Sequence, residues 1–327
     1  MKRYIKMVAA LLALMASFTA CENGDQAFDD YEGGTTVMFV YQSPVRTIVL
    51  GDDEYDTSLD KEHKCKIKAT FAGSYNGRKG YVNVAVDNSL CDHLTFADGT
   101  PVKAMPAEYY SLSTNKLDFK GGMTGETVVQ LTDAFFNDPD AVKNTYVIPL
   151  AMTDQQGFDR ISAGTLKEGA TGSRTNAAIW ETVPKDYVMY CVKYQNKYSG
   201  WWLTHHNTST DNIEKASKVQ ITTRTLNSSV YSVEFQEGST IYKADLLLTF
   251  DANEKCTITS LTDGVTATGT GSWADDALLS WNNKYRDLME LNAEITFAGG
   301  VKKNLNEKLV WQRSGVTKEE FSFTYNN

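Results

Sequence analysis

Histidine, cysteine and the short motifs of common enzyme classes are scarce or absent in this sequence. Only four of the 327 residues are histidine and five are cysteine, and their spacing matches no zinc site. The adjacent His205 and His206 would point to opposite faces of a strand, so they cannot chelate one ion together. There is no Gly-x-Ser-x-Gly elbow, no phosphate-binding glycine loop with Lys-Ser or Lys-Thr, and no His-Glu-x-x-His. We therefore predict no catalytic residue, no metal and no cofactor.

Two functions that need no such motif stay open. A surface calcium ion can be held by aspartate and carbonyl oxygens alone. A glycosidase needs only two carboxylates at a set separation, which 41 acidic residues could supply without a recognisable sequence pattern.

Positive charge is also in short supply. Lysine and arginine number 32 against 41 acidic residues, which gives a formal net charge of −9. Removal of an N-terminal leader with Lys2, Arg3 and Lys6, and with no acid before Cys21, takes this to −12. An acidic protein repels phosphate backbones and anionic headgroups, so nucleic acid is not an expected partner. No run after the N-terminus reaches the length of a membrane-spanning helix.

The N-terminus carries the clearest signal in the chain. Three basic residues precede an apolar run, Met7 to Ala16, that is too short to span a bilayer. Phe18-Thr19-Ala20-Cys21 follows, the order that bacterial lipoprotein signal peptidase reads. We predict that residues 1–20 are removed and that Cys21 becomes a lipid anchor at the outer membrane, exposed at the cell surface. An ordinary secretory signal is the alternative. Residues 21–34 are acidic and contain glycine, which predicts a flexible tether.

Short strands dominate the first half of the chain. In Lys64–Phe71 the residues Cys65, Ile67, Ala69 and Phe71 alternate with polar neighbours, as in a half-buried antiparallel strand. The other strands are expected at Thr36–Tyr41, Val45–Leu50, Tyr81–Val86, Lys116–Phe119, Thr127–Leu131 and Tyr146–Met152. Asp133–Phe136 is expected to form a single helical turn. About seven strands predict an immunoglobulin-like β-sandwich over residues 35–170.

A change of composition separates the second half. Ser162–Asn176 is rich in Gly, Ser, Thr and Ala, and all six tryptophans come after it, so we place a domain boundary there. Residues 180–327 read as eight or nine antiparallel strands with short turns. Such strands can remove their exposed edges by closing into a β-barrel, which holds one small ligand or is filled by side chains. An open sandwich is the alternative.

Four cysteines remain after Cys21. Cys65 and Cys256 fall on apolar strand faces, where a free thiol acts as a small hydrophobic group. We therefore expect Cys65, Cys91, Cys191 and Cys256 to be reduced and mostly buried. The pairs Cys65–Cys91 and Cys191–Cys256 are the alternative, because an exported protein permits disulfides.

Tryptophans and amides suggest a sugar site. In the strand that contains Trp201 and Trp202, Leu203 is expected to face the core, which turns Trp202 outwards. An exposed indole is a platform for the flat C–H face of a sugar, unless a loop or the other domain covers it. Trp273 and Trp281 lie in a polar stretch whose composition is as typical of a sugar site as of a plug at a barrel end. The predicted ligand-binding residues are Trp202, Trp273, Trp281, Asn282 and Asn283.

Several runs resemble known bacterial modules. Tyr41–Ile48, Asp56–Asp60, Asp87–Cys91 and Asn144–Leu150 are similar to N-terminal β-sandwich modules of Bacteroidetes surface lipoproteins, some of which precede a chitinase-like endoglycosidase domain. Pro184–Tyr187, Val192–Tyr194, Tyr198–Gly200 and Asn283–Asp287 resemble a lipocalin-like barrel module of unknown function that often follows this sandwich. The resemblance implies an accessory domain encoded in glycan-utilisation clusters, and the paired acidic motif of the glycosidase has no counterpart here.

These observations predict a lipid-anchored, non-catalytic glycan-binding protein of the cell surface, with the sandwich as a spacer. The alternatives are a structural or assembly subunit that docks to an outer-membrane transporter or enzyme, and an unrecognised glycoside hydrolase.

Overall fold

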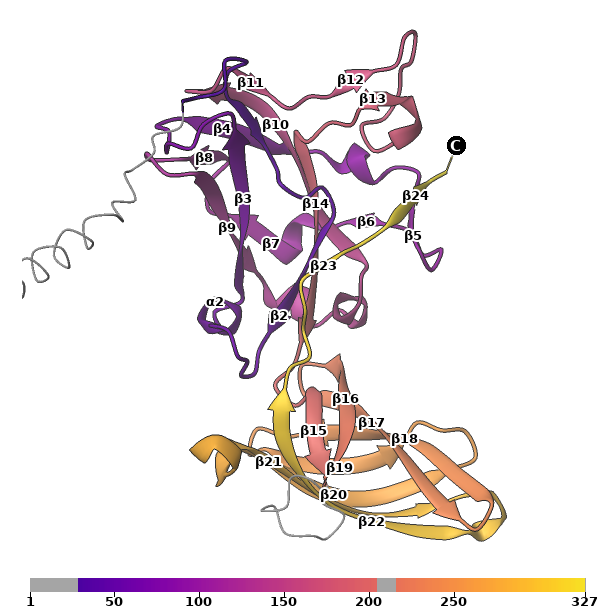
Figure 1. The fold of residues 1–327 in the computed structure, drawn as a ribbon. Coiled ribbons are helices and arrows are strands. Elements are labelled where there is room, and N and C mark those ends of the chain that lie inside the picture. Colours follow the sequence, from indigo (N-terminus) through magenta and orange to yellow (C-terminus); the bar gives the residue numbers. More distant parts are fainter. Residues whose placement is uncertain (1–28, 205–215, 327) are drawn as a thin grey trace, which may run out of the picture.

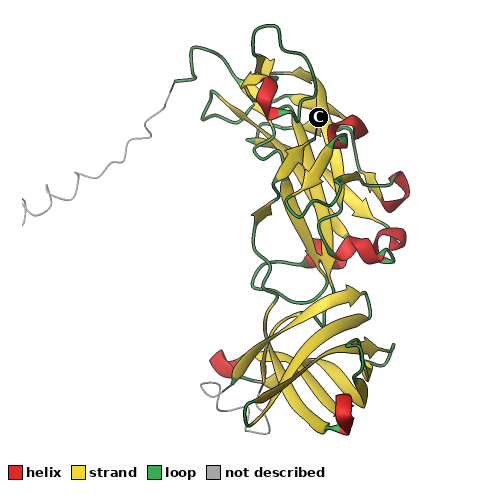
Figure 2. Ribbon diagram, turned by 90° about the vertical axis from the view of Figure 1, so that its right-hand side faces the viewer, coloured by secondary structure: helices red, strands yellow, loops and turns green. Residues whose placement is uncertain are grey.

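The computed structural model describes residues 29–204 and 216–326. Cys21 and the pair His205–His206 lie outside the described residues. The chain forms an elongated molecule in which a β-sandwich and a β-barrel lie end to end (Figures 1 and 2). Within the described ranges, no helix is long and apolar enough to cross a membrane.

Two sheets make up the sandwich, as the sequence predicts. The first has the order β11 (Arg160–Ile161), β1 (Thr36–Met38), β3 (Lys64–Ala72), β9 (Thr124–Leu131) and β7 (Tyr110–Leu112). The second has the order β23 (Glu319–Glu320), β2 (Pro44–Val49), β14 (Tyr187–Gln195), β10 (Tyr146–Gln156), β4 (Tyr81–Val86) and β8 (Lys116–Asp118), and β6 (Lys103–Ala104) pairs with β10. Two further pairs are β12 (Thr165–Leu166) with β13 (Trp180–Thr182), and β24 (Phe323–Tyr325) with β5 (Leu94–Phe96).

The alternating pattern of β3 produces the sandwich core. Cys65, Ile67, Ala69 and Phe71 are each at most 5% exposed, while the lysines between them face outwards. The helices α2 (Ser58–Lys61) and α3 (Asp133–Phe136) are single turns. The second confirms the helical turn expected from the sequence, and its two phenylalanines are buried in the same core.

The domain boundary expected at Ser162–Asn176 lies before the point at which the chain passes from the sandwich to the barrel. β14 follows it, yet β14 pairs antiparallel with β10 and parallel with β2, so it is a central strand of the sandwich. Its run of buried residues on both faces is typical of a strand covered on both sides. The chain enters the barrel only at Gly200, after this strand.

The end of the chain returns to the sandwich. After the barrel, β23 pairs with β2 and β24 pairs with β5 (Figure 1). Phe321, between these strands, is 6% exposed and its ring lies 5.1 Å from that of Phe96. The barrel is therefore held to the sandwich by two chain connections.

The barrel is closed, as predicted, by eight antiparallel strands in sequence order. They are β15 (Gly200–Thr204), β16 (Ser217–Thr225), β17 (Ser228–Glu237), β18 (Thr240–Phe250), β19 (Lys255–Ser260), β20 (Thr266–Leu279), β21 (Tyr285–Thr296) and β22 (Lys302–Arg313). β22 pairs with β15 to close the ring. Side chains such as Trp202, Leu246 and Met289, all fully buried, fill the interior.

The predicted outward direction of Trp202 is wrong. Trp202 is 0% exposed, and its Nε1 donates a hydrogen bond to the carbonyl oxygen of Tyr198 at 3.1 Å. The prediction assumed that a buried Leu203 faces the interior of the barrel. Leu203 is indeed buried, at 5% exposure, but it pairs with Val310, and neither belongs to the cluster of side chains that fills the interior. Burial of Leu203 therefore did not mark the inward face. The half-buried Trp201 lies on the opposite side of the strand from Trp202.

The four cysteines of the described residues are free and buried, which confirms the expectation. Burial raises the pKa of each thiol to about 12. Such thiols stay protonated at neutral pH and are poor nucleophiles.

Trp202→Ala should destabilise the barrel rather than remove a binding platform. Truncation of a buried tryptophan leaves a cavity and costs about 3–5 kcal/mol of unfolding free energy. Chemical denaturation followed by circular dichroism measures this loss. Trp201→Ala is the matched control and should cost less, because that ring is only half-buried. A loss below about 1 kcal/mol for Trp202→Ala would contradict the packing described here.

Candidate functional site

A loop of the sandwich, residues 50–57, forms one side of the candidate site. It is anchored by Asp60 of α2, which is 0% exposed. Asp60 Oδ2 accepts a hydrogen bond from the backbone N–H of Val49 at 2.9 Å, and Oδ1 pairs with Arg46. Lys61 then donates to Asp52 Oδ1 at 2.7 Å. These contacts fix the acidic run that begins at Asp52 next to the barrel.

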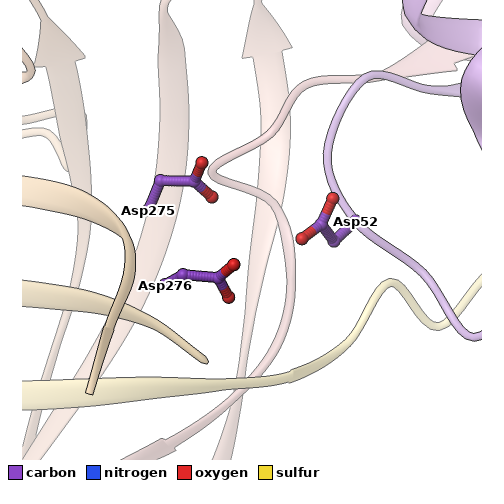
Figure 3. Close-up of side chains that lie close together, drawn as sticks. All are labelled: Asp52, Asp275 and Asp276. Atoms are coloured by element: carbon purple, nitrogen blue, oxygen red, sulfur yellow. The ribbon is translucent and has the colours of Figure 1, made fainter. Parts of the chain in front are cut away.

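A bulge in the barrel forms the other side. The pairing of β20 with β21 shifts between Ala274 and Leu278, so Asp275 and Asp276 leave the regular ladder. Asp276 has a φ of 43°, a conformation that Asp tolerates better than most residues. Its N–H donates to Asp287 Oδ1 at 3.2 Å. The bulge thereby directs both carboxylates toward Asp52 of the sandwich (Figure 3).

The carboxylates from the two domains meet at short range. Oxygens of Asp52, Asp275 and Asp276 all lie within 4.8 Å of one another. Asp287 lies beside them and is 5% exposed. Burial raises the pKa of Asp287 to about 7, and the neighbouring Asp275 and Asp52 add to the effect. The hydrogen bond to Asp52 raises the pKa of Lys61, a positively charged neighbour of these carboxylates.

This cluster offers oxygen ligands of the kind that Ca²⁺ prefers. The sequence left a calcium ion held by aspartates open, and the geometry brings three such side chains together. Lys61 already neutralises part of their charge, and a proton on Asp287 would neutralise more. The arrangement therefore has two ways to balance its charge, by a cation or by a proton.

A pocket of about 650 Å³ opens next to the cluster, between the sandwich loop and the end of the barrel. Trp281 and Asn282, from the turn between β20 and β21, line it together with Tyr285 and Arg286. The Arg286 guanidinium lies 3.8 Å from the Trp281 ring centroid. Tyr285 is 61% exposed. The pocket thus combines aromatic rings with amide, guanidinium and carboxylate groups.

Two of the five predicted ligand-binding residues, Trp281 and Asn282, line this pocket. Asn283 follows them but is not among the lining residues, and it is exposed. Asn282 and Asn283 have φ values of 60° and 54°. Asparagine adopts this left-handed region more readily than most residues, so the backbone conformation of the turn explains why asparagine occurs at both positions.

Trp273 and Trp202 lie elsewhere, inside the barrel. Trp273 is 8% exposed, its ring is 5.7 Å from that of Tyr198, and Lys197 Nζ lies 4.3 Å from its centroid. It packs at the end of the barrel core and does not line the pocket. Prediction from composition could not separate it from Trp281, because both occur in the same polar stretch.

Sequence reasoning missed most of the pocket. Asp52, Lys218, Tyr285, Arg286 and Asp287 come from three separate parts of the chain. Two signals were available: the polar stretch around Trp273 and Trp281, in which Arg286 is one of the interleaved polar residues, and the Asn283–Asp287 run, which carried a family resemblance and no assigned role. Lys218 Nζ also lies 4.2 Å from the ring centroid of Trp201, so the other member of the tryptophan pair borders this region.

Asp287→Asn should stabilise the protein at high pH. The folded-state pKa of Asp287 lies above the unfolded value, so Asp287 binds a proton more tightly in the folded protein. The unfolding free energy of the protein therefore falls as pH rises from about 4 to about 7. The cost is complete above that range and is on the order of a few kcal/mol. Asn removes the charge and with it this cost.

The measurement is unfolding free energy of both proteins at pH 5 and pH 8. The stabilisation by Asp287→Asn should be larger at pH 8. Asp263→Asn, at an exposed aspartate between β19 and β20, is the control and should show no such difference. Equal effects of Asp287→Asn at both pH values would refute the buried, charge-repelled state of Asp287.

Known proteins share both halves of this chain. Residues 30–159 match a family of N-terminal domains, and residues 190–315 match DUF5627, a domain of unknown function. No curated protein matches the sequence. A solved structure of a Bacteroides ovatus protein of unknown function has a TM-score of 0.82 and 30% identity, and the match covers 91% of this chain and 100% of that chain.

Two other solved structures from Bacteroides ovatus are less similar. A multidomain protein that includes DUF1735 has 12% identity and a TM-score of 0.38, with 84% of this chain and 92% of that chain covered. A candidate carbohydrate-binding protein has 11% identity and a TM-score of 0.26, with 89% and 98% covered. At such scores neither likeness bears on function. The identity and full coverage of the first structure show that this chain belongs to the family of that Bacteroides ovatus protein, which shares its sandwich and barrel.

Proposed function

We propose that this protein is a non-catalytic glycan-binding protein and that the pocket between sandwich and barrel is its binding site. One observation carries the proposal. The exposed ring of Tyr285 and the rings of Trp281 and Trp311 line a pocket of about 650 Å³, and the other lining residues are polar or charged. Ligand sites combine apolar surface with a few polar groups that fix orientation, and this pocket has that composition.

The chemistry of a sugar fits these groups. The C–H face of a pyranose ring lies flat on an aromatic side chain, and its hydroxyls exchange hydrogen bonds with amides, carboxylates and guanidinium groups. Asn282 and Arg286 line the same pocket as the two rings. The pocket is open and has room for few sugar units, so we expect weak affinity at each site.

The proposal includes a lipid anchor at Cys21 and a cell-surface location. The first described residues lie at the end of the sandwich away from the barrel (Figure 1), and Asp30 pairs there with Arg78. An anchor that precedes them would leave the pocket a full sandwich length from the membrane. This arrangement supports a role for the sandwich as a spacer in a polysaccharide-utilisation system.

Tyr285→Ala and Trp281→Ala should each weaken glycan binding about tenfold, equivalent to about 1.4 kcal/mol. The experiment is a glycan array with a soluble chain that starts at Asp29, followed by isothermal titration of the glycans that bind. Starting at Asp29 keeps the Asp30–Arg78 pair. Thermal unfolding checks that each variant remains folded.

Tyr75→Ala is the matched control, because Tyr75 is 76% exposed and lies after β3, in the sandwich. It should bind glycans as the native chain does. If no plant, host or microbial glycan binds, the proposal is wrong. A pull-down from envelope extracts then tests the alternative, a subunit that docks to an outer-membrane transporter or enzyme.

A further inference from the structure

Arg286 is a charged side chain of the pocket between sandwich and barrel whose hydrogen-bond donors have no acceptor. It lies near the start of β21, is half-buried, and lines the pocket beside Trp281 and Asn282. Its Nε is buried, and neither Nε nor the two Nη atoms donates to an acceptor in the described part of the chain. A buried donor without an acceptor costs free energy. The guanidinium therefore has hydrogen-bonding capacity that the protein itself does not use.

The ring of Trp281 fixes the position of this guanidinium. Its central carbon lies over the ring, 3.8 Å from the centroid. A guanidinium that lies over an aromatic ring keeps its N–H groups available, because they point outward within its own plane. Burial lowers the pKa of Arg286, and the charge of Glu54 offsets this only in part, but arginine stays protonated in proteins. The pocket thus holds a fixed positive group whose donors are unused.

Other cations of the pocket are also unpaired. The lining contains three more basic residues besides Arg286, and they are Lys218, Lys284 and Arg313. Within residues 29–204 and 216–326, no carboxylate of the lining pairs with any of the four. Asp52 pairs instead with Lys61, which is not a lining residue. Opposite charges that share one pocket without pairing leave the cations available to an anionic ligand.

The two kinds of charge come from different elements. Residues 52–54 belong to the sandwich loop, and Asp276 belongs to the bulge of β20. Asp287 follows Arg286 directly on β21, so the two side chains point to opposite faces of that strand. The cations come from β16, from the turn before β21, from β21 itself and from the end of β22. The pocket therefore has an acidic side and a basic side, and Arg286 belongs to the basic side.

We propose that the sugar bound in this pocket is acidic and that its carboxylate or sulfate group pairs with Arg286. This inference rests on the proposed glycan-binding function and names the class of glycan. A planar guanidinium donates two parallel hydrogen bonds to such a group, and these are stronger than hydrogen bonds to a neutral hydroxyl. A sugar ring on Tyr285 or Trp281 would place its substituents among the polar groups of the same pocket.

Two series of monosaccharides that differ only at C6 test the proposal. They are galactose, galacturonate and galactose 6-sulfate, and glucose, glucuronate and glucose 6-sulfate. Each is titrated at pH 7 into the chain that starts at Asp29, and binding is followed by NMR. In at least one series an acidic sugar should bind about tenfold more tightly than the neutral sugar. Comparison of the carboxylate with the sulfate then decides which group the pocket prefers.

Three results would overturn the proposal. Equal binding of neutral and acidic sugars would refute the charge preference and leave glycan binding itself intact. Tighter binding of glucosamine than of glucuronate would place the charged group of the sugar on the acidic side. Absence of binding by all six sugars would also refute the proposal, and the glycan array then decides separately whether the chain binds glycans.

Variants connect the preference to Arg286. Arg286→Gln removes the charge and should lower the ratio of acidic to neutral affinity to about one. Arg224→Gln is the matched control, because Arg224 is exposed on β16, does not line the pocket, and loses the same charge. It should preserve the ratio. Equal effects of the two variants would show that the net charge of the protein sets the preference, and would refute the contact with Arg286.

A second variant keeps the test decisive if Arg286→Gln fails to fold. Arg286→Lys keeps the positive charge but replaces the planar pair of donors with a single ammonium group. The ratio of acidic to neutral affinity should fall roughly threefold. An unchanged ratio in a folded Arg286→Lys protein would refute the paired contact.

Discussion

The hydrogen bonds of Gln195 hold the two domains in one arrangement. Gln195 is the last residue of β14, and its Nε2 donates to the carbonyl oxygens of Ser199 at 2.9 Å and Ser314 at 3.1 Å. Ser199 precedes the first barrel strand and Ser314 follows the last. One amide therefore ties together the chain segments that enter and leave the barrel. The adjoining Asn196, 1% exposed, donates to the carbonyl oxygens of Thr225 and Ser228, and a buried polar group that loses its partners costs about 1–3 kcal/mol.

The pocket proposed to bind a glycan depends on this junction, because neither domain forms it alone. Asp52 reaches it from the sandwich, and Asp276 and Trp281 reach it from the barrel. The facing carboxylates repel one another, so they would separate the domains if the connection were loose. The junction and the return of the C-terminal strands oppose this repulsion. Unfavourable charge concentrated at one contact is typical of a binding site, where groups are placed for a ligand rather than for stability.

Local patterns in the sequence predicted local structure well. Period-two alternation placed β3 and its buried face, and the closed barrel followed from a run of short antiparallel strands. β14 falls within the residues expected to form the barrel but belongs to the sandwich, because its partners, β2 and β10, are set by contacts distant in sequence. The prediction placed Trp202 on the outward face of its strand because Leu203, on the other face, is also buried. The pocket was found only in part, since Asp52 comes to Trp281 through the arrangement of the two domains and Lys218 through the closure of the barrel.

The barrel supports the proposed glycan pocket at one end, and its own interior is filled by side chains. Trp202 and Trp311 pair across the seam where β15 meets β22, and they are 0% and 8% exposed. On β22, Trp311 lines the proposed glycan pocket, and Leu309, two residues before it, is fully buried in the barrel core. Close-packed side chains therefore fill the barrel directly behind the pocket. A ligand in the pocket would contact the end of the barrel and not its interior, so the lining of the pocket can be changed by mutation while the core stays intact.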